Sequence, residues 1–230
     1  MSDHTVKSFS QELEELGALI ARMGGLAEDL LTDTLRAVVT QDLHLAETVV
    51  DRDKLIDDLQ AEVEREIMRI LALRQPMAKD LRQTVSAMKV AAELERIGDL
   101  SKNIAKRTRM LGAGAPPAGI KGVARMGRVL VAQLNNVLDA YAAMDTEAAV
   151  QVRLRDEEVD EHHNALFREV LTYMMEDPRT INGCTHLLFI AKNLERIGDH
   201  CTNIAEEIYF LVTGKILTTE RPKSDALIDE

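Results

Sequence analysis

The most constraining feature of this sequence is an internal repeat. At an offset of 100, residues 91–105 (AAELERIGDLSKNIA) align with residues 191–205 (AKNLERIGDHCTNIA), and ten of the fifteen positions are identical. At an offset of 103, three acids also recur: Asp42 as Asp145, Asp53 as Asp156 and Asp57 as Asp160. The chain therefore contains two copies of one unit, which we expect to be related by pseudo-symmetry.

Each unit is predicted to be helical. The residues are mostly strong helix formers, and the five prolines all fall between the periodic segments. No alternating Val, Ile and Thr run bounded by turn residues indicates a strand. Six long helices are expected, over 8–42, 44–74, 77–111, 120–144, 146–176 and 180–213. Short connections make neighbouring helices antiparallel, so the prediction is an all-α fold of two tandem, pseudo-symmetric antiparallel three-helix bundles.

One Gly-, Ala- and Pro-rich stretch, residues 112–119, reads as a linker near the middle of the chain. We therefore expect a first bundle over 1–112, a linker over 113–119, a second bundle over 120–217 and a disordered tail over 218–230. The Gly24-Gly25 pair predicts a kink in the first helix.

Composition excludes several classes of partner. The formal net charge is −11, and the chain has only 4 Phe, 3 Tyr and no Trp. Nucleic-acid binding needs a basic surface and aromatic platforms, and docking on anionic lipid needs basic residues as well. No apolar stretch is long enough to span a membrane, and the N-terminus lacks a signal core. We expect a cytoplasmic protein with reduced Cys184 and Cys201.

Paired acids recur at helical spacing. In the third predicted helix, Glu95 and Asp99 lie nearly opposite the apolar stripe, and Glu195 and Asp199 repeat this in the sixth. On the second and fifth helices the pairs lie about a quarter-turn from the apolar face, as Asp53 with Asp57 and Asp156 with Asp160. Stacked acids repel one another, and a multivalent cation removes that repulsion. The pattern favours a surface metal site in each half, while a solvated acidic face remains the alternative.

Two other repeated features bear on this site. Gly98 and Gly198 stand inside predicted helices, where glycine costs about 1 kcal/mol relative to alanine, so we expect another helix to approach closely there. No phosphate-binding loop or Gly-x-Ser-x-Gly nucleophile motif is visible.

The doubled Leu-Glu-Arg-Ile-Gly-Asp-x-x-x-Asn-Ile-Ala resembles the PhoU family of bacterial phosphate-signalling regulators. Residues 74–82 (RQPMAKDLR), Asp53-Lys-Leu-Ile-Asp57 and Asp156-Glu-Glu-Val-Asp160 resemble it as well, over about residues 8–214. The resemblance implies two three-helix bundles with metal bound through the acid-x-x-x-acid motifs. The implied ligands are Asp53, Asp57, Glu95, Asp99, Asp156, Asp160, Glu195 and Asp199, with Asn103, Asn203 and His200 as further candidates.

The resemblance also implies a cofactor and partners. The metal would be a divalent or trivalent ion, iron or zinc first and manganese or magnesium as alternatives, in a site that could be polynuclear. The role would be negative regulation of the phosphate-starvation regulon and of uptake by the Pst transporter. The partners would be the transporter's ATPase subunit, a PhoR-type sensor kinase and a second copy of the chain, without membrane insertion.

We therefore predict a metal-binding signalling adaptor rather than an enzyme. Two alternatives stay open. A metalloenzyme such as a phosphatase could use a two-metal carboxylate site, although such sites lie in concave pockets rather than on an outer face. A structural helical module without metal would keep its fold and its partners after chelation.

Overall fold

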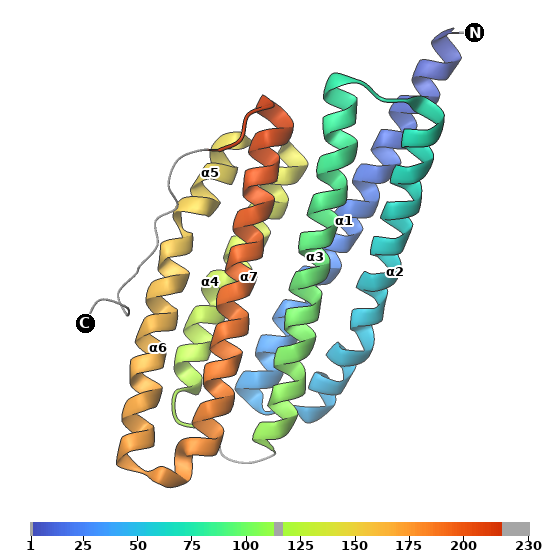
Figure 1. Ribbon diagram of the computed structural model, residues 1–230. Coiled ribbons are helices and arrows are strands. Elements are labelled where there is room, and N and C mark those ends of the chain that lie inside the picture. The colour runs from blue at the N-terminus through green and yellow to red at the C-terminus, as the bar shows by residue number, and fades with distance from the viewer. Residues whose placement is uncertain (1, 113–116, 218–230) are drawn as a thin grey trace.

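The computed structural model describes residues 2–112 and 117–217, and it confirms the all-α fold (Figure 1). The helices are α1 (Ser2–Thr40), α2 (Leu43–Arg74), α3 (Ala78–Leu111), α4 (Ile120–Ala143), α5 (Thr146–Leu154), α6 (Asp156–Glu176) and α7 (Ile181–Thr213), with a short 3-10 helix η1 (Pro178–Thr180) before α7. No strand occurs in the described ranges. Most of the expected linker and the tail after residue 217 lie outside the described residues.

The helices form two antiparallel bundles, α1–α3 and α4–α7, and in the second α5 and α6 together take the place of one long helix (Figure 1). Helices α3 and α7 lie side by side at the centre and run in opposite directions, and α1 packs against α4 behind them. This arrangement places the two repeats around a pseudo-twofold axis that crosses the helices. No described helix is both long enough and apolar enough to cross a bilayer.

The apolar stripes form the core as the periodicity predicts. On α2 the buried side chains follow one another at helical spacing, and the same holds for α3 and α7. The stripes are Ile56, Leu59, Val63, Ile67 and Ile70 on α2, Val90, Leu94, Ile97 and Ile104 on α3, and Leu187, Ile190, Leu194, Ile197, Ile204, Ile208 and Leu211 on α7. Packing of these stripes sets the distances between the helices, and so also between the acidic residues that the helices carry.

The turn that opens the second helix is copied in both repeats. Asp42 caps α2 by accepting a hydrogen bond from the Leu45 amide at 2.9 Å, and Asp145 caps α5 by accepting from the Glu147 and Ala148 amides. The residue before each cap is left-handed, with φ 55° at Gln41 and φ 52° at Met144. The repeated aspartates thus end one helix and begin the next at matched positions.

The prediction of one unbroken helix over 146–176 is wrong, because the helix is interrupted at Arg155. The equivalent residue of the first repeat, Arg52, lies within the continuous α2. It forms ion pairs with Asp33 at 2.8 Å and Asp29 at 3.3 Å on α1. At the corresponding positions α4 carries the uncharged Asn136 and Ala132. No Gly or Pro marks the interruption, so helix-breaker signals do not predict it.

Helix α1 runs through Gly24-Gly25 without a break, and the predicted kink there stays a prediction. Gly24 receives a side chain from α4: a Cβ added there would lie 2.6 Å from Leu138 Cδ2. Symmetrically, a Cβ on Gly127 of α4 would lie 2.4 Å from Leu35 Cδ2 on α1. The two glycines form matched notches that let α1 and α4 pack closely across the pseudo-twofold axis.

Candidate functional site

The first acidic face, made of Asp53 and Asp57 on α2 and Glu95 and Asp99 on α3, lies on neighbouring helices. Burial and the charges of Asp53 and Asp99 raise the pKa of Asp57, although the residue as a whole is exposed. Burial and the neighbouring Asp99 and Asp57 likewise raise the pKa of Glu95. The structure thus brings all four predicted acids into one electrostatically coupled cluster.

Asp53 departs from the expected surface position, because only 2% of the residue is exposed. A buried carboxylate needs a partner, and Lys102 of α3 supplies it. The Lys102 ammonium bonds Asp53 Oδ2 and also Asp99 Oδ1 at 2.6 Å. Burial opposes the charge on Lys102, but these two hydrogen bonds outweigh it and raise its pKa.

Gly98 explains how Asp53 fits between the helices. A Cβ added at Gly98 would lie 2.9 Å from Ile56 Cδ1 and 3.4 Å from Asp53 Oδ1. In the second repeat, a Cβ at Gly198 would lie 3.0 Å from Asp156 Oδ1. The expected close approach at the repeated glycines is confirmed: Ile56 comes closest to Gly98, with Asp53 beside it, and Asp156 comes closest to Gly198.

The second acidic face consists of Asp156 and Asp160 on α6 and Glu195 and Asp199 on α7. Asp156 begins α6 directly after the interruption, is 2% exposed, and accepts a hydrogen bond from Gln133 Nε2 of α4 at 3.3 Å. Glu195 pairs with Lys192 at 2.7 Å on the same helix. Both acidic faces therefore combine one buried aspartate with three more accessible acids.

These carboxylates suit a hard cation, but the side chains are not gathered around one point. Among the described residues no group of three or more His, Cys, Asp or Glu side chains is placed to hold a metal ion. Asp53 Oδ1 is nevertheless buried without a hydrogen-bond partner, as is Gln133 Oε1 beside Asp156. Carboxylate and amide oxygens are ligands that hard cations prefer, so these donors suit a metal in their chemistry but not in their described positions.

His200 and Asn203, further candidate ligands, are engaged elsewhere. His200 Nδ1 lies 2.6 Å from Glu93 Oε2 of α3, and Asn203 donates to the same oxygen at 3.1 Å. Burial opposes ionisation of Glu93, but these hydrogen bonds outweigh it and lower its pKa. The cluster joins the two repeats, and the sequence did not single out Glu93 because helical spacing alone does not pair it with α7.

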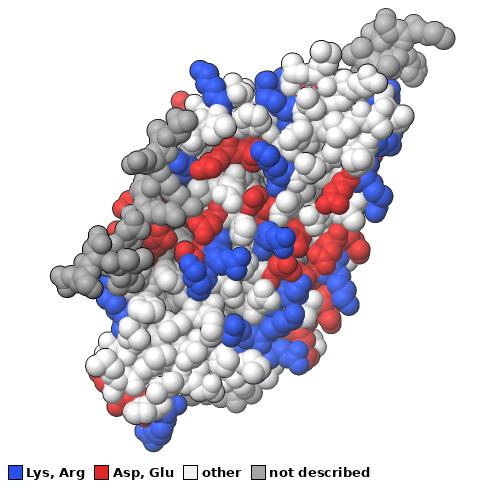
Figure 2. Space-filling model, viewed as in Figure 1, with Lys and Arg blue, Asp and Glu red and all other residues white. Residues whose placement is uncertain are grey.

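Two further contacts join α3 to α7 at pseudo-symmetric positions. Lys89 pairs with Glu207 at 2.5 Å, whereas at the equivalent positions the Arg107 guanidinium lies 3.9 Å from the centre of the Phe189 ring. Figure 2 shows charged side chains gathered over the middle of this view, where α3 and α7 meet in Figure 1. The contact between α3 and α7 therefore carries charged and polar side chains, whereas α1 and α4 meet through apolar ones.

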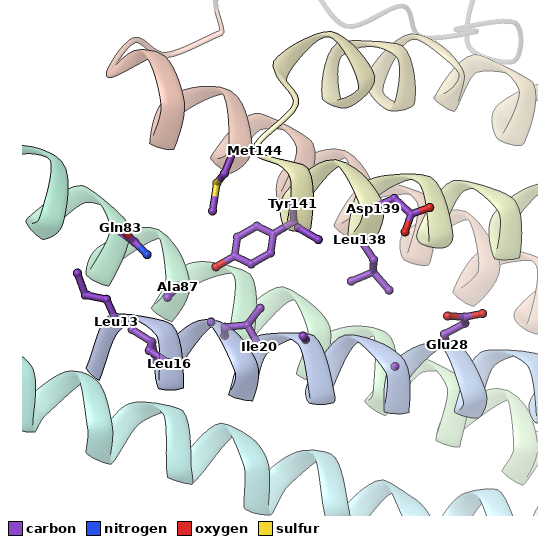
Figure 3. A pocket seen from close by; sticks show the side chains of 14 residues that line it. Leu13, Leu16, Ile20, Glu28, Gln83, Ala87, Leu138, Asp139, Tyr141 and Met144 are labelled. Carbon is purple, nitrogen blue, oxygen red and sulfur yellow. The ribbon is translucent and has the colours of Figure 1, made fainter. Parts of the chain in front are cut away.

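A separate cavity of about 390 Å³ lies between α1, α3 and α4 (Figure 3). Its lining is mostly apolar, with Glu28 and Asp139 at one end and the Tyr141 ring near the other. Burial raises the pKa of Tyr141 to about 12.

Cys184 and Cys201 are free, as expected, and both are buried away from solvent, which raises the pKa of the Cys201 thiol. Neither the cavity nor the cysteines provide an activated nucleophile.

The fold and the paired acidic faces define a class: tandem helical-bundle proteins with a duplicated carboxylate motif. The family model described as the PhoU domain matches residues 20–108 and 123–208, and the chain belongs to the PhoU family. A phosphate-specific transport system accessory protein PhoU homolog from Caulobacter vibrioides is 54% identical over 228 residues, covering 99% of each chain.

Solved structures agree with this assignment. The crystal structure of PhoU from Pseudomonas aeruginosa is 38% identical and has a TM-score of 0.87 over 90% of this chain and 100% of that chain. The phosphate transport system regulatory protein PhoU from Streptococcus pneumoniae is 30% identical, with a TM-score of 0.85 over 92% and 100% of the two chains. These relatives carry the names of accessory or regulatory proteins, not of enzymes.

Proposed function

We propose that this protein is a cytoplasmic regulator of phosphate transport that represses the phosphate-starvation regulon and restrains uptake by the Pst transporter. The observation that carries the proposal is its end-to-end similarity to a phosphate transport accessory protein, at 54% identity over 99% of both chains. Both repeats lie within the matched region, so the similarity covers both acidic faces.

In this proposal the protein is an adaptor that acts as a homodimer. It contacts the ATPase subunit of the transporter and a PhoR-type sensor kinase, and it does not insert into the membrane. An adaptor needs surfaces for partners rather than a reactive group, and neither the cavity nor the cysteines of the described chain provide an activated nucleophile. The role therefore fits an ordered helical scaffold better than catalysis.

The proposal includes metal binding at the two acidic faces. The ligands would be Asp53, Asp57, Glu95 and Asp99 in the first repeat, and Asp156, Asp160, Glu195 and Asp199 in the second. A bound iron, zinc, manganese or magnesium ion would neutralise carboxylates that otherwise repel one another. The raised pKa values of Asp57 and Glu95 support this reading in part, because burial is their main cause and the neighbouring carboxylates add to it.

Gene deletion followed by complementation tests the role. We expect the deletion strain to express alkaline phosphatase and to take up excess phosphate in high-phosphate medium, and the wild-type gene to restore repression. Asp99→Asn combined with Asp199→Asn should fail to restore it while accumulating as folded protein. The matched control is Glu64→Gln with Glu157→Gln, which removes two exposed acids outside the faces. Unchanged phosphatase and uptake after deletion would overturn the proposal.

A further inference from the structure

The two repeats differ in the groups that surround one matched arginine. In the first repeat, Arg52 forms ion pairs with Asp33 at 2.8 Å and Asp29 at 3.3 Å on α1. The equivalent arginine of the second repeat is Arg155, and the α4 residues that correspond to the two aspartates are uncharged. The Arg155 side chain is exposed and forms no ion pair within the described chain. The second repeat thus keeps the cation but not the carboxylates that neutralise it.

Arg155 lines a hollow of about 250 Å³ between α4 and the junction of α5 with α6. Arg128 of α4 lines the same hollow, and its side chain is also exposed and has no ion pair among the described residues. The lining further contains two amides and one carboxylate, those of Gln133, Asn136 and Glu158, beside apolar side chains. Two guanidinium groups without a carboxylate partner therefore border one hollow.

The equivalent hollow of the first repeat carries the opposite charge. It lies between α1 and α2, and its charged lining consists of three carboxylates and one arginine, namely Asp29, Asp58, Glu62 and Arg22. The residue that corresponds to Arg128 there is Gly25. The residue that corresponds to Glu158 is Leu55. The paired arginines are thus a feature of the second repeat alone and not of the duplicated unit.

From this arrangement we propose that the hollow beside Arg155 binds a tetrahedral oxyanion, and that this anion is inorganic phosphate in its hydrogen phosphate form. Guanidinium groups match the oxygens of a phosphate through paired N–H donors, and two guanidinium charges balance a dianion. Phosphate binding at this hollow goes beyond the regulatory role and does not depend on metal at the acidic faces.

The hydrogen-bond acceptors of the hollow favour phosphate over other anions of the same shape. An ionised carboxylate such as that of Glu158 accepts hydrogen bonds but donates none. The amide oxygen of Gln133, in the same lining, is buried without a hydrogen-bond partner. Hydrogen phosphate carries a proton that it can donate to an acceptor, whereas sulfate and the dianion of a phosphomonoester carry none. The carboxylate therefore repels those two anions without a compensating hydrogen bond.

Direct binding of inorganic phosphate to the full chain tests the proposal. Radiolabelled phosphate is measured by equilibrium dialysis at neutral pH and low salt, because salt screens exposed arginines. We expect saturable binding to the wild-type protein. Unlabelled sulfate and methyl phosphate should compete only at concentrations roughly tenfold higher than unlabelled phosphate, which is the effect of one hydrogen bond to a charged group.

Single substitutions locate the site. Arg155→Gln and Arg128→Gln should each weaken phosphate binding by roughly tenfold or more, because each removes charged hydrogen bonds to the anion. Arg22→Gln is the matched control, since it removes an exposed arginine from the equivalent hollow of the first repeat and should leave binding unchanged. Glu158→Gln should remove most of the preference for phosphate over sulfate, because an amide can donate to either anion. Circular dichroism confirms that each variant is folded.

Three results would overturn the proposal. They are the absence of saturable phosphate binding by the wild-type protein, equal losses with Arg155→Gln and Arg22→Gln, and equal competition by sulfate and phosphate. None of them bears on the regulatory role, which stands or falls on phosphatase and uptake in the deletion strain.

Discussion

The two repeats keep the same acids but stabilise their buried aspartates differently. Asp53 of the first repeat bonds the charged Lys102, whereas Asp156 of the second accepts a hydrogen bond from the neutral Gln133. The helix that carries Asp53 is continuous, and the helix that carries Asp156 begins at that residue. Duplication has thus preserved the motif while the surroundings changed, so equal sequence motifs do not imply equal chemistry.

The largest effect should come from removing the charged partner. We expect Lys102→Met to lower the free energy of unfolding by about 3–5 kcal/mol, because it leaves a buried charge on Asp53 uncompensated. Gln133→Leu, which removes a neutral partner of the buried Asp156, should cost less, about 1.5–3 kcal/mol, because it removes one hydrogen bond to a carboxylate and no opposite charge. Urea unfolding of the two variants measures the difference, and equal losses would contradict the contrast between the repeats.

A smaller effect is expected where the glycines admit neighbouring side chains. Gly98→Ala and Gly198→Ala should each destabilise the protein by about 1–2 kcal/mol, because the new methyl group would crowd Ile56 in one repeat and the Asp156 carboxylate in the other. Gly25→Ala is the matched control, since nothing lies within 4 Å of its added Cβ. It should raise stability by up to about 1 kcal/mol through helix propensity. Thermal unfolding distinguishes them, and a stabilised Gly198→Ala would show that α6 is not closely packed there.

The cluster that joins the repeats should make stability depend on pH. The folded-state pKa of Glu93 is lowered, so its ionised form stabilises the fold above its unfolded pKa of about 4.3, and that contribution disappears as pH falls through the lower folded pKa. Glu93→Gln should therefore be less stable than wild type at pH 7 by about 1–2 kcal/mol. The gap should close only as pH falls through the lowered folded-state pKa of Glu93. Denaturant unfolding at several pH values measures it, and a gap independent of pH would contradict the assignment.

The smallest effects concern the two pseudo-symmetric contacts between α3 and α7. Lys89→Met removes an ion pair with a half-exposed lysine and should cost less than about 1 kcal/mol, decreasing further in high salt. Arg107→Met removes a cation–π contact with Phe189 and should cost about 0.5–1 kcal/mol with weaker salt dependence. Unfolding at low and high salt separates the two, and an identical salt response would show that the contacts are of one kind.

Most of the fold could be predicted from the sequence because helical signals are local. Periodicity located the apolar stripes, and the repeat implied two bundles. The interruption at Arg155 could not be predicted, because it accompanies changes on another helix, at Ala132 and Asn136. The notch at Gly24 likewise depends on Leu138, more than 100 residues away in the chain.

The residues of the acidic faces could be predicted from the sequence, but their burial and their hydrogen-bond partners could not. Spacing placed the acids on the correct helices, yet it gave no measure of how far α2 and α6 pack toward α3 and α7. Asp53 and Asp156 consequently proved more buried than a surface site requires. Lys102 was not singled out, because its role depends on a contact to Asp53 across two helices as well as on its own i, i+3 neighbour Asp99.

The most direct test of the account measures alkaline phosphatase in high-phosphate medium in the deletion strain, complemented separately with Asp99→Asn and Asp199→Asn at matched protein levels. If the acidic faces take part in the proposed regulation, the wild-type gene should restore repression, and each of the two variants should leave phosphatase partly derepressed. Full repression by both variants would contradict the account.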